Sequence, residues 1–222
     1  MSIKEKLQMS IAVLLENNDR RVWLPLPVNK ARFAAVLDKI GGECGHFIIK
    51  EYACRVPKLR VSMLMEKPLS LVNYLASRLN KLNDDGITKL CAICESEYYF
   101  YLVEQYIDFT FQTNDYTILC GVTDEEALGL YYIGDPKNYI SDKVVKQYID
   151  RREYGRRIAE AENGVFTPSG YLTSSIGWDL MPTERHIPQS LNLKGYINED
   201  IYGDYSNEYM IPSYREAKNE QA

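Results

Sequence analysis

The apolar segments of this 222-residue chain are short, and no other feature constrains its fold as strongly. The longest purely aliphatic run is Ile11 to Leu15, far below the roughly 20 residues of a membrane-spanning helix. Apolar residues make up 45% and charged residues 26% of the chain, which is an ordinary globular mixture. We therefore expect short helices and strands around small cores, no secretory signal, and five reduced Cys residues in the cytoplasm.

Short periodic segments fill the N-terminal half. The spacing of Ile3, Leu7, Ile11 and the two leucines that follow predicts an amphipathic helix over residues 3–16. Asn29 is predicted to cap the next helix, and Asp84-Asp85-Gly86 is predicted to separate the two helices after it. The predicted strands cover residues 20–27, 46–53 and 58–65. The later helices cover residues 29–40, 69–82 and a stretch ending near residue 97.

The second half begins with an aromatic stretch over residues 98–111, which fits a helix or a strand and favours a strand over its last four residues. A strand is predicted over 116–120. Thr123 and Glu126 match a capping box at the start of the next helix. A longer helix is predicted over 142–162, followed by a turn over 164–172. These segments together predict an α+β fold class.

The charge is unevenly distributed. The net charge is −5, but residues 1–90 sum to about +6 and residues 91–150 to about −8. Sixteen of the 18 Tyr residues lie from Tyr98 onward. Because Lys and Arg supply most of the affinity for nucleic acid, the acidic half suits a partner that itself binds nucleic acid. An ordinary solvated acidic surface is the alternative.

Residues with catalytic or metal-binding potential are few. Cys91 and Cys94 have the spacing of a redox pair or half a zinc site, and equally share one face of a predicted helix as core residues. His46 and His186 lie in no nucleophile motif, and no phosphate-binding glycine loop is present. Four arginines, Arg151, Arg152, Arg156 and Arg157, fit a helix surface with ion pairs or a contact to an anionic partner. We therefore expect a protein without catalysis, cofactor or metal.

The acidic residues of the second half form the candidate partner-binding set. Helical neighbours lie about 5–6 Å apart, so acids in a row imitate roughly every second phosphate of a DNA strand. The set is Glu95, Glu97, Glu104, Asp108, Asp115, Asp124, Glu125, Glu126, Asp135, Asp142 and Asp150.

The stretch from Tyr148 to Leu172 resembles the C-terminal signature of the ArdA antirestriction family. Gly121 to Ile133 is similar to the family's acidic segment, and residues 22–53 are similar to its first strand–helix–strand unit. The resemblance covers about residues 20–173. The signature positions are Tyr148, Ile149, Asp150, Tyr154, Gly155, Arg156, Gly164, Phe166, Thr167, Gly170 and Tyr171.

The resemblance implies an elongated chain of two to three small α/β lobes that forms a homodimer. Its members are encoded on conjugative elements and plasmids and mimic bent DNA. They occupy the DNA groove of type I restriction-modification enzymes without catalysis or cofactor, and direct binding of nucleic acid is not expected. This chain is more basic at Lys30, Arg32 and Lys39 than the family, so mimicry is expected mainly in residues 91–150.

The predicted organisation follows from the segments and the resemblance together. It comprises an N-terminal helix (1–19), an α+β lobe (20–66), a helical middle lobe (67–104), a C-terminal α+β lobe (105–173) and a Tyr- and acid-rich extension (174–222). The alternative function is an interaction protein of this fold that inhibits another nucleic-acid-targeting defence system or regulates transfer of a mobile element.

Overall fold

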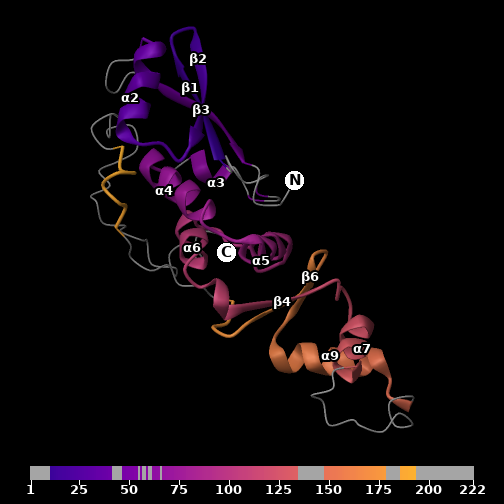
Figure 1. The fold of residues 1–222 in the computed structure, drawn as a ribbon. Coiled ribbons are helices and arrows are strands. Elements are labelled where there is room, and N and C mark those ends of the chain that lie inside the picture. Colours follow the sequence, from indigo (N-terminus) through magenta and orange to yellow (C-terminus); the bar gives the residue numbers. More distant parts are fainter. Residues whose placement is uncertain are drawn as a thin grey trace, which may run out of the picture. The chain divides into compact units, whose positions relative to one another are not determined.

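The computed structural model describes residues 11–41, 47–54, 56, 59, 62–65, 67–134, 148–178 and 186–193. These residues form seven α-helices, one short 3-10 helix and two three-stranded antiparallel sheets (Figure 1). The predicted α+β class is therefore confirmed as a mixed helix-and-strand fold. No helix among the described residues is both long and apolar enough to cross a membrane.

The chain divides into two compact units. Unit 1 comprises Met1–Asp84, Phe100–Phe111 and Met181–Ala222. Unit 2 comprises Asp85–Tyr99 and Gln112–Leu180. The predicted lobes were contiguous in sequence, whereas each unit combines segments that are separated along the chain.

The sheet of unit 1 has the order β2-β1-β3, so the first strand lies in its centre. The strands are β1 (Ile11–Asn17), β2 (Arg20–Leu26) and β3 (Ile48–Cys54). Asn17 pairs with Arg20, and Asn18 takes a positive φ of 51° in the two-residue turn between them. Ile11, Val13 and Leu15 are fully buried along one face of β1.

The helix predicted over residues 3–16 is thus wrong for Ile11–Asn17, and residues 1–10 lie outside the described part. An apolar run of this length fits a buried strand as well as a helix when periodicity is the only criterion. The turn at Asn18-Asp19 and the hydrogen-bonded partner on each side of β1 select the strand.

Helix α2 (Lys30–Lys39) confirms the helix predicted after Asn29. The Asn29 side chain accepts a hydrogen bond of 2.9 Å from the Arg32 backbone N–H, and Gly41 follows the helix at a φ of +69°. The strand predicted over 58–65 is wrong, because its described end forms the one-turn helix α3 (Ser62–Met65). The helical turn fully buries Leu64 among the core side chains of unit 1.

Helices α4 (Leu69–Leu79), α5 (Asp84–Glu95) and α6 (Val103–Phe109) follow in sequence. Asp84-Asp85-Gly86 forms the first turn of α5 and does not end α4. Acidic side chains favour a helix N-terminus, and Asp85 pairs with Lys89 at 2.7 Å. The strand favoured over 108–111 is wrong, since Gln105 Oε1 accepts from the N–H groups of Tyr101 and Leu102 and so stabilises the start of α6.

Residues 186–193, which have no helix or strand, pack onto α4. Asn73 is fully buried and its side-chain amide donates to the carbonyl of Leu191 at 2.9 Å. The same side chain pairs with both backbone polar groups of Val28, at 2.7 and 2.8 Å. The Leu193 N–H donates to Ser70 Oγ at 2.8 Å, and the Leu193 side chain is fully buried. This segment therefore belongs to the core of unit 1.

Unit 2 contains the second sheet, in the order β4-β6-β5, and two helices. The strands are β4 (Tyr116–Cys120), β5 (Val165–Thr167) and β6 (Gly170–Ser174), which confirm the predicted strand and turn. Val122, Leu128 and Tyr171 form the buried core, against which Phe166 and Ile158 pack. The 3-10 helix η1 (Thr113–Asp115) precedes β4.

The two helices of unit 2 begin at aspartates. In α7 (Glu125–Gly134) Asp124, and not the predicted Thr123, caps the helix by accepting from the Ala127 N–H at 2.8 Å. Helix α9 (Arg151–Glu162) begins after Asp150, whose extended backbone excludes the continuous helix predicted over 142–162. Residues 135–147 lie outside the described part.

Candidate partner-binding site

Two glycines allow α7 and α9 to meet backbone to backbone (Figure 1). A Cβ atom at Gly129 would overlap with the carbonyl oxygen of Arg151, and one at Gly155 would overlap with that of Glu125. Both glycines are buried. The Gly155 of the sequence signature therefore fixes how closely the two helices of unit 2 pack.

Other signature residues also build unit 2. The Tyr171 hydroxyl donates to Glu162 Oε2 at 2.9 Å, and the Tyr132 hydroxyl donates to Glu162 Oε1 at 2.5 Å. Burial and the neighbouring Glu162 carboxylate both raise the pKa of Tyr171. A Cβ atom at Gly164 would overlap with the Tyr171 ring, and Gly170 takes a φ of +145° where β6 begins. These residues stabilise the fold and leave few of the signature positions for a partner.

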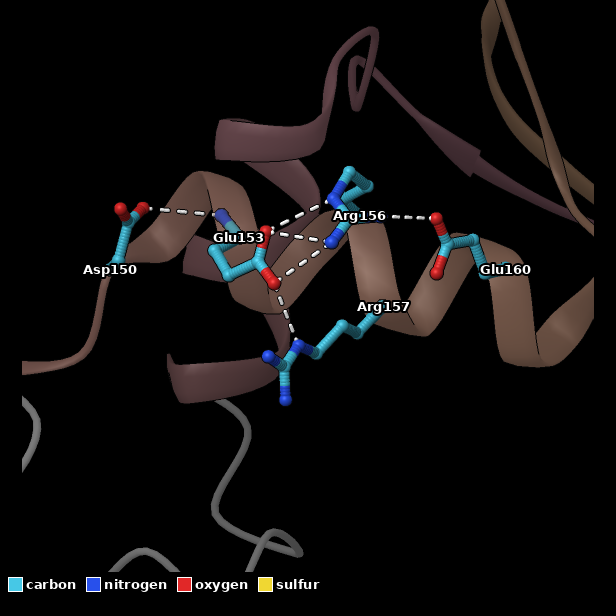
Figure 2. Close-up of polar contacts among 5 residues, drawn as sticks. All are labelled: Asp150, Glu153, Arg156, Arg157 and Glu160. Atoms are coloured by element: carbon cyan, nitrogen blue, oxygen red, sulfur yellow. Dashed lines mark hydrogen bonds and ion pairs between the residues drawn. The ribbon is translucent and has the colours of Figure 1, made fainter.

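The four arginines of α9 are largely paired within unit 2. Arg156 and Arg157 donate to Glu153 at 2.8 Å, and Arg156 also pairs with Glu160, as Figure 2 shows. Asp150 Oδ1 accepts from the Glu153 N–H at 3.1 Å and caps the helix (Figure 2). Hydrogen bonds from Arg157 and Arg156 lower the pKa of Glu153. Much of the basic cluster is thus neutralised by its own helix.

The acids predicted for partner binding differ in exposure. Glu97, Asp124, Glu126 and Asp150 are exposed on unit 2. Three more acids of unit 2, Glu95, Asp115 and Glu125, are half-buried, and Glu95 accepts from Ser169 Oγ at 2.8 Å. Asp135 and Asp142 lie outside the described residues.

Two of the predicted acids belong to unit 1, on α6. Asp108 is fully buried, so its place in the partner-binding set is corrected: it cannot face a partner in this fold. Glu104 is half-buried and pairs with Lys67 at 3.3 Å. The sequence does not predict this burial, because residues 98–111 fit a helix or a strand and their buried side depends on tertiary packing.

Exposed aromatic side chains occur on or next to the same two helices as the exposed acids. Tyr131 lies exposed on α7, and Tyr148, which precedes α9, is 84% exposed. Arg152 of α9 lies 3.8 Å from Glu126 of α7 and links the two helices at their surface. We call Asp124, Glu126, Tyr131, Tyr148 and Asp150 the acidic–aromatic set. The tyrosine-rich composition pointed to such a surface but not to these positions on the helices.

The candidates for metal or redox chemistry are dispersed. Cys94 is buried in α5 and Cys91 is half-buried, where burial and Glu95 raise its pKa. His186 is exposed and His46 lies outside the described residues. Within the described part of the chain, no three His, Cys, Asp or Glu side chains are grouped in a way that could hold a metal ion.

A scan against protein-family models and a search of curated proteins both give no match for this chain. The chemistry of the site therefore rests on its own residues. Acidic caps at two packed helices and exposed tyrosines can form charge-assisted hydrogen bonds and aromatic contacts with a basic protein surface.

Proposed function

We propose that this chain is an ArdA-like antirestriction protein that mimics DNA. In this proposal it acts in the cytoplasm as a homodimer, without catalysis or cofactor. It occupies the DNA-binding groove of a type I restriction-modification enzyme and so protects incoming mobile DNA. The sequence resemblance over residues 20–173 suggests the target class.

The observation that carries the proposal is the placement of Asp124, Glu126 and Asp150. All three are exposed, and they stand on two helices held together through Gly129 and Gly155. In a DNA-binding groove, these carboxylates would meet the Lys and Arg side chains that otherwise bind phosphates. Tyr131 and Tyr148 would add contacts of the kind that dominate protein interfaces.

The charge of unit 2 supports the same function. Its two segments contain 14 acidic and 8 basic side chains, a net charge of −6. Arg156 and Arg157 pair with Glu153 and Glu160 of their own helix. Of the three exposed acids named above, only Glu126 has an arginine of α9, Arg152, within 4 Å among the described ion pairs. An interface of exposed charges is screened by salt, so inhibition should weaken as ionic strength rises.

The close packing of α7 and α9 also favours binding. Contact through two glycine backbones leaves little room for one helix to move against the other. A preorganised surface loses less conformational freedom on binding, which strengthens the complex.

Phage plating on cells with a type I restriction system tests the proposal. Expression of the wild-type chain should restore plating of unmodified phage. The variant Asp124→Ser, Glu126→Gln, Asp150→Ser removes three charges while serine still caps both helices. We expect this variant to remain folded and to lose most of the protection.

The matched control is Asp19→Asn, Asp38→Asn, Asp84→Asn, which removes three exposed charges from unit 1. It should protect as well as the wild type. Equal protection by both triple variants would contradict the role of the acidic–aromatic set. No protection by soluble, folded wild-type chain would contradict the proposed function itself.

A further inference from the structure

The outer face of the β2-β1-β3 sheet in unit 1 carries an exposed tryptophan. Trp23 pairs directly with Leu14 across the strands, so the two side chains share a face, opposite to Ile11, Val13 and Leu15. Leu14 is half-buried, whereas the Trp23 side chain is 45% exposed. A flat aromatic ring on a sheet is a platform on which another planar group can stack.

Two cations stand on the same face, held by one carboxylate. Glu16 pairs across the strands with Arg21 and forms ion pairs with the Arg21 guanidinium and with Lys50 Nζ, the latter at 3.1 Å. The Glu16 side chain is only 11% exposed, while those of Arg21 and Lys50 are 65% and 43% exposed. Glu16 therefore orients both cations, whose remaining donors face solvent.

The spacing of Trp23 and Arg21 fits a polymeric ligand in which planar and anionic groups alternate. Arg21 and Trp23 are two residues apart on one strand, which places them about 6.7 Å apart on the same face. Residues 1–84 contain 14 basic and 8 acidic side chains, whereas unit 1 as a whole has a net charge of +1, so the attraction for anions on this face comes from Arg21 and Lys50 themselves.

We propose that this face binds single-stranded nucleic acid. One base stacks on Trp23, and neighbouring phosphates contact Arg21 and Lys50. Stacking on exposed aromatic rings combined with a cationic path for the backbone is the general chemistry of single-strand binding. The proposal concerns unit 1 and is independent of the function proposed for unit 2.

The neighbours of Trp23 favour nucleic acid over a protein partner. Arg21, Glu16 and Lys50 place three charges on this face beside the ring. Leu14 opposite Trp23 and Ile48 opposite Glu16 are apolar, so the face mixes charged and apolar groups, whereas the centre of a protein interface is depleted of charge. Glu51, which pairs with Leu14 on the other side, is exposed and repels phosphate. The bound strand therefore follows β2 along Trp23 and Arg21 and reaches β3 at Lys50, where the neighbouring Glu51 weakens the contact.

Fluorescence anisotropy of the full chain with labelled oligothymidylate and oligouridylate tests the proposal. Oligonucleotides of about 12 residues lie within the site sizes of single-strand binders. We expect saturable binding at low salt. Trp23→Ala should weaken it about fivefold or more, because stacking is lost, whereas Trp23→Phe should retain most of the affinity.

Charge variants locate the path of the phosphates. Arg21→Ala with Lys50→Ala should reduce the salt dependence of log Kobs by about 1.4, since each phosphate contact contributes about 0.7 on a single strand. The matched control, Arg32→Ala with Lys39→Ala, removes two exposed cations from α2 and should change the slope little. Glu51→Gln should tighten binding.

Three results would overturn the proposal. The first is no saturable binding of either oligonucleotide at low salt by the folded wild-type chain. The second is equal affinity of the wild type and Trp23→Ala, or an equal decrease in the salt dependence of log Kobs for the Arg21/Lys50 variant and the Arg32/Lys39 control. The third is a change of molecular mass in light scattering for Trp23→Ala, which would show that a second copy covers this face.

Discussion

Gly155 is the residue whose missing side chain allows α7 and α9 to pack closely in unit 2. A methyl group at this position would overlap with the backbone carbonyl of Glu125, and backbone atoms cannot move aside as a flexible side chain can. We predict that Gly155→Ala destabilises unit 2 by about 2 kcal/mol, in the range of other overpacking substitutions. Urea unfolding, followed by Trp178 fluorescence in a Trp23→Phe background, measures the effect within unit 2.

Gly134→Ala provides the control for that substitution. Gly134 closes α7, and a Cβ atom there meets nothing within 4 Å. Alanine is also the better helix former. The control should unfold at the same urea concentration as the wild type or at a higher one. A Gly155→Ala variant as stable as Gly134→Ala would disprove the close crossing of α7 and α9.

Glu153 organises the charges of α9, and its effect on stability depends on pH. Hydrogen bonds from Arg157 and Arg156 lower its pKa in the folded chain below the ordinary value of 4.5. Its stabilisation is therefore present above that value and is lost as pH falls through the folded-state pKa. We predict that Glu153→Gln lowers the melting temperature at pH 7 and that the difference from wild type shrinks in acid.

Circular dichroism melts at pH 7 and at pH 3 measure this dependence. Glu97→Gln removes the same charge from an exposed position that follows α5 and serves as the control. It should leave the melting temperature nearly unchanged at both pH values. A Glu153→Gln deficit of the same size at both pH values would show that packing, and not ionisation, explains its effect.

Elements bounded by local signals were predicted well from the sequence. The Asn29 cap, strand β4 and the β5–β6 hairpin depend on hydrogen bonds and turn residues that are close in sequence. The sequence predicts a helix where β1 forms, because the identity of this strand depends on its pairing with β2 and with β3, which lies more than 30 residues further along. Local periodicity cannot reveal a partner at that distance.

The candidate site was predicted only in part, for the same reason. The sequence supplied the acids, but their exposure depends on tertiary packing. Asp124 and Asp150 are exposed because helix caps lie at the ends of helices, at the surface of unit 2. Asp108 is the same residue type as Asp124 and Asp150, but it lies on α6, which is buried along most of its length.

Unit 1 is assembled from three separate segments of the chain. Asn73 shows how the segments are joined: its amide group bonds to Val28, 45 residues earlier, and to Leu191, 118 residues later. A buried amide that lost these partners would be costly, so the pairing fixes the segments specifically. Nothing in the local sequence around Asn73 indicates either partner.

The segment containing Leu193 should consequently determine the stability of unit 1 and not that of unit 2. The Leu193 side chain is fully buried, and its N–H bonds to Ser70 of α4. We predict that Leu193→Ala in the full chain destabilises unit 1 by about 2–5 kcal/mol, as leucine truncation in a core does. Unit 1 contains Trp23 and unit 2 contains Trp178, the two Trp residues of the chain. Fluorescence in a Trp178→Phe background therefore reports the unfolding of unit 1, and fluorescence in a Trp23→Phe background reports that of unit 2.

Ser190→Ala, an exposed position in the same segment, is the control and should leave both transitions unchanged. With Leu193→Ala, the Trp23 signal should move to lower urea while the Trp178 signal keeps its midpoint. Unchanged midpoints for both signals would mean that the segment contributes nothing to the core of unit 1. An equal shift of both signals would mean that the two units unfold as one cooperative body, because independent units respond only to changes in their own cores.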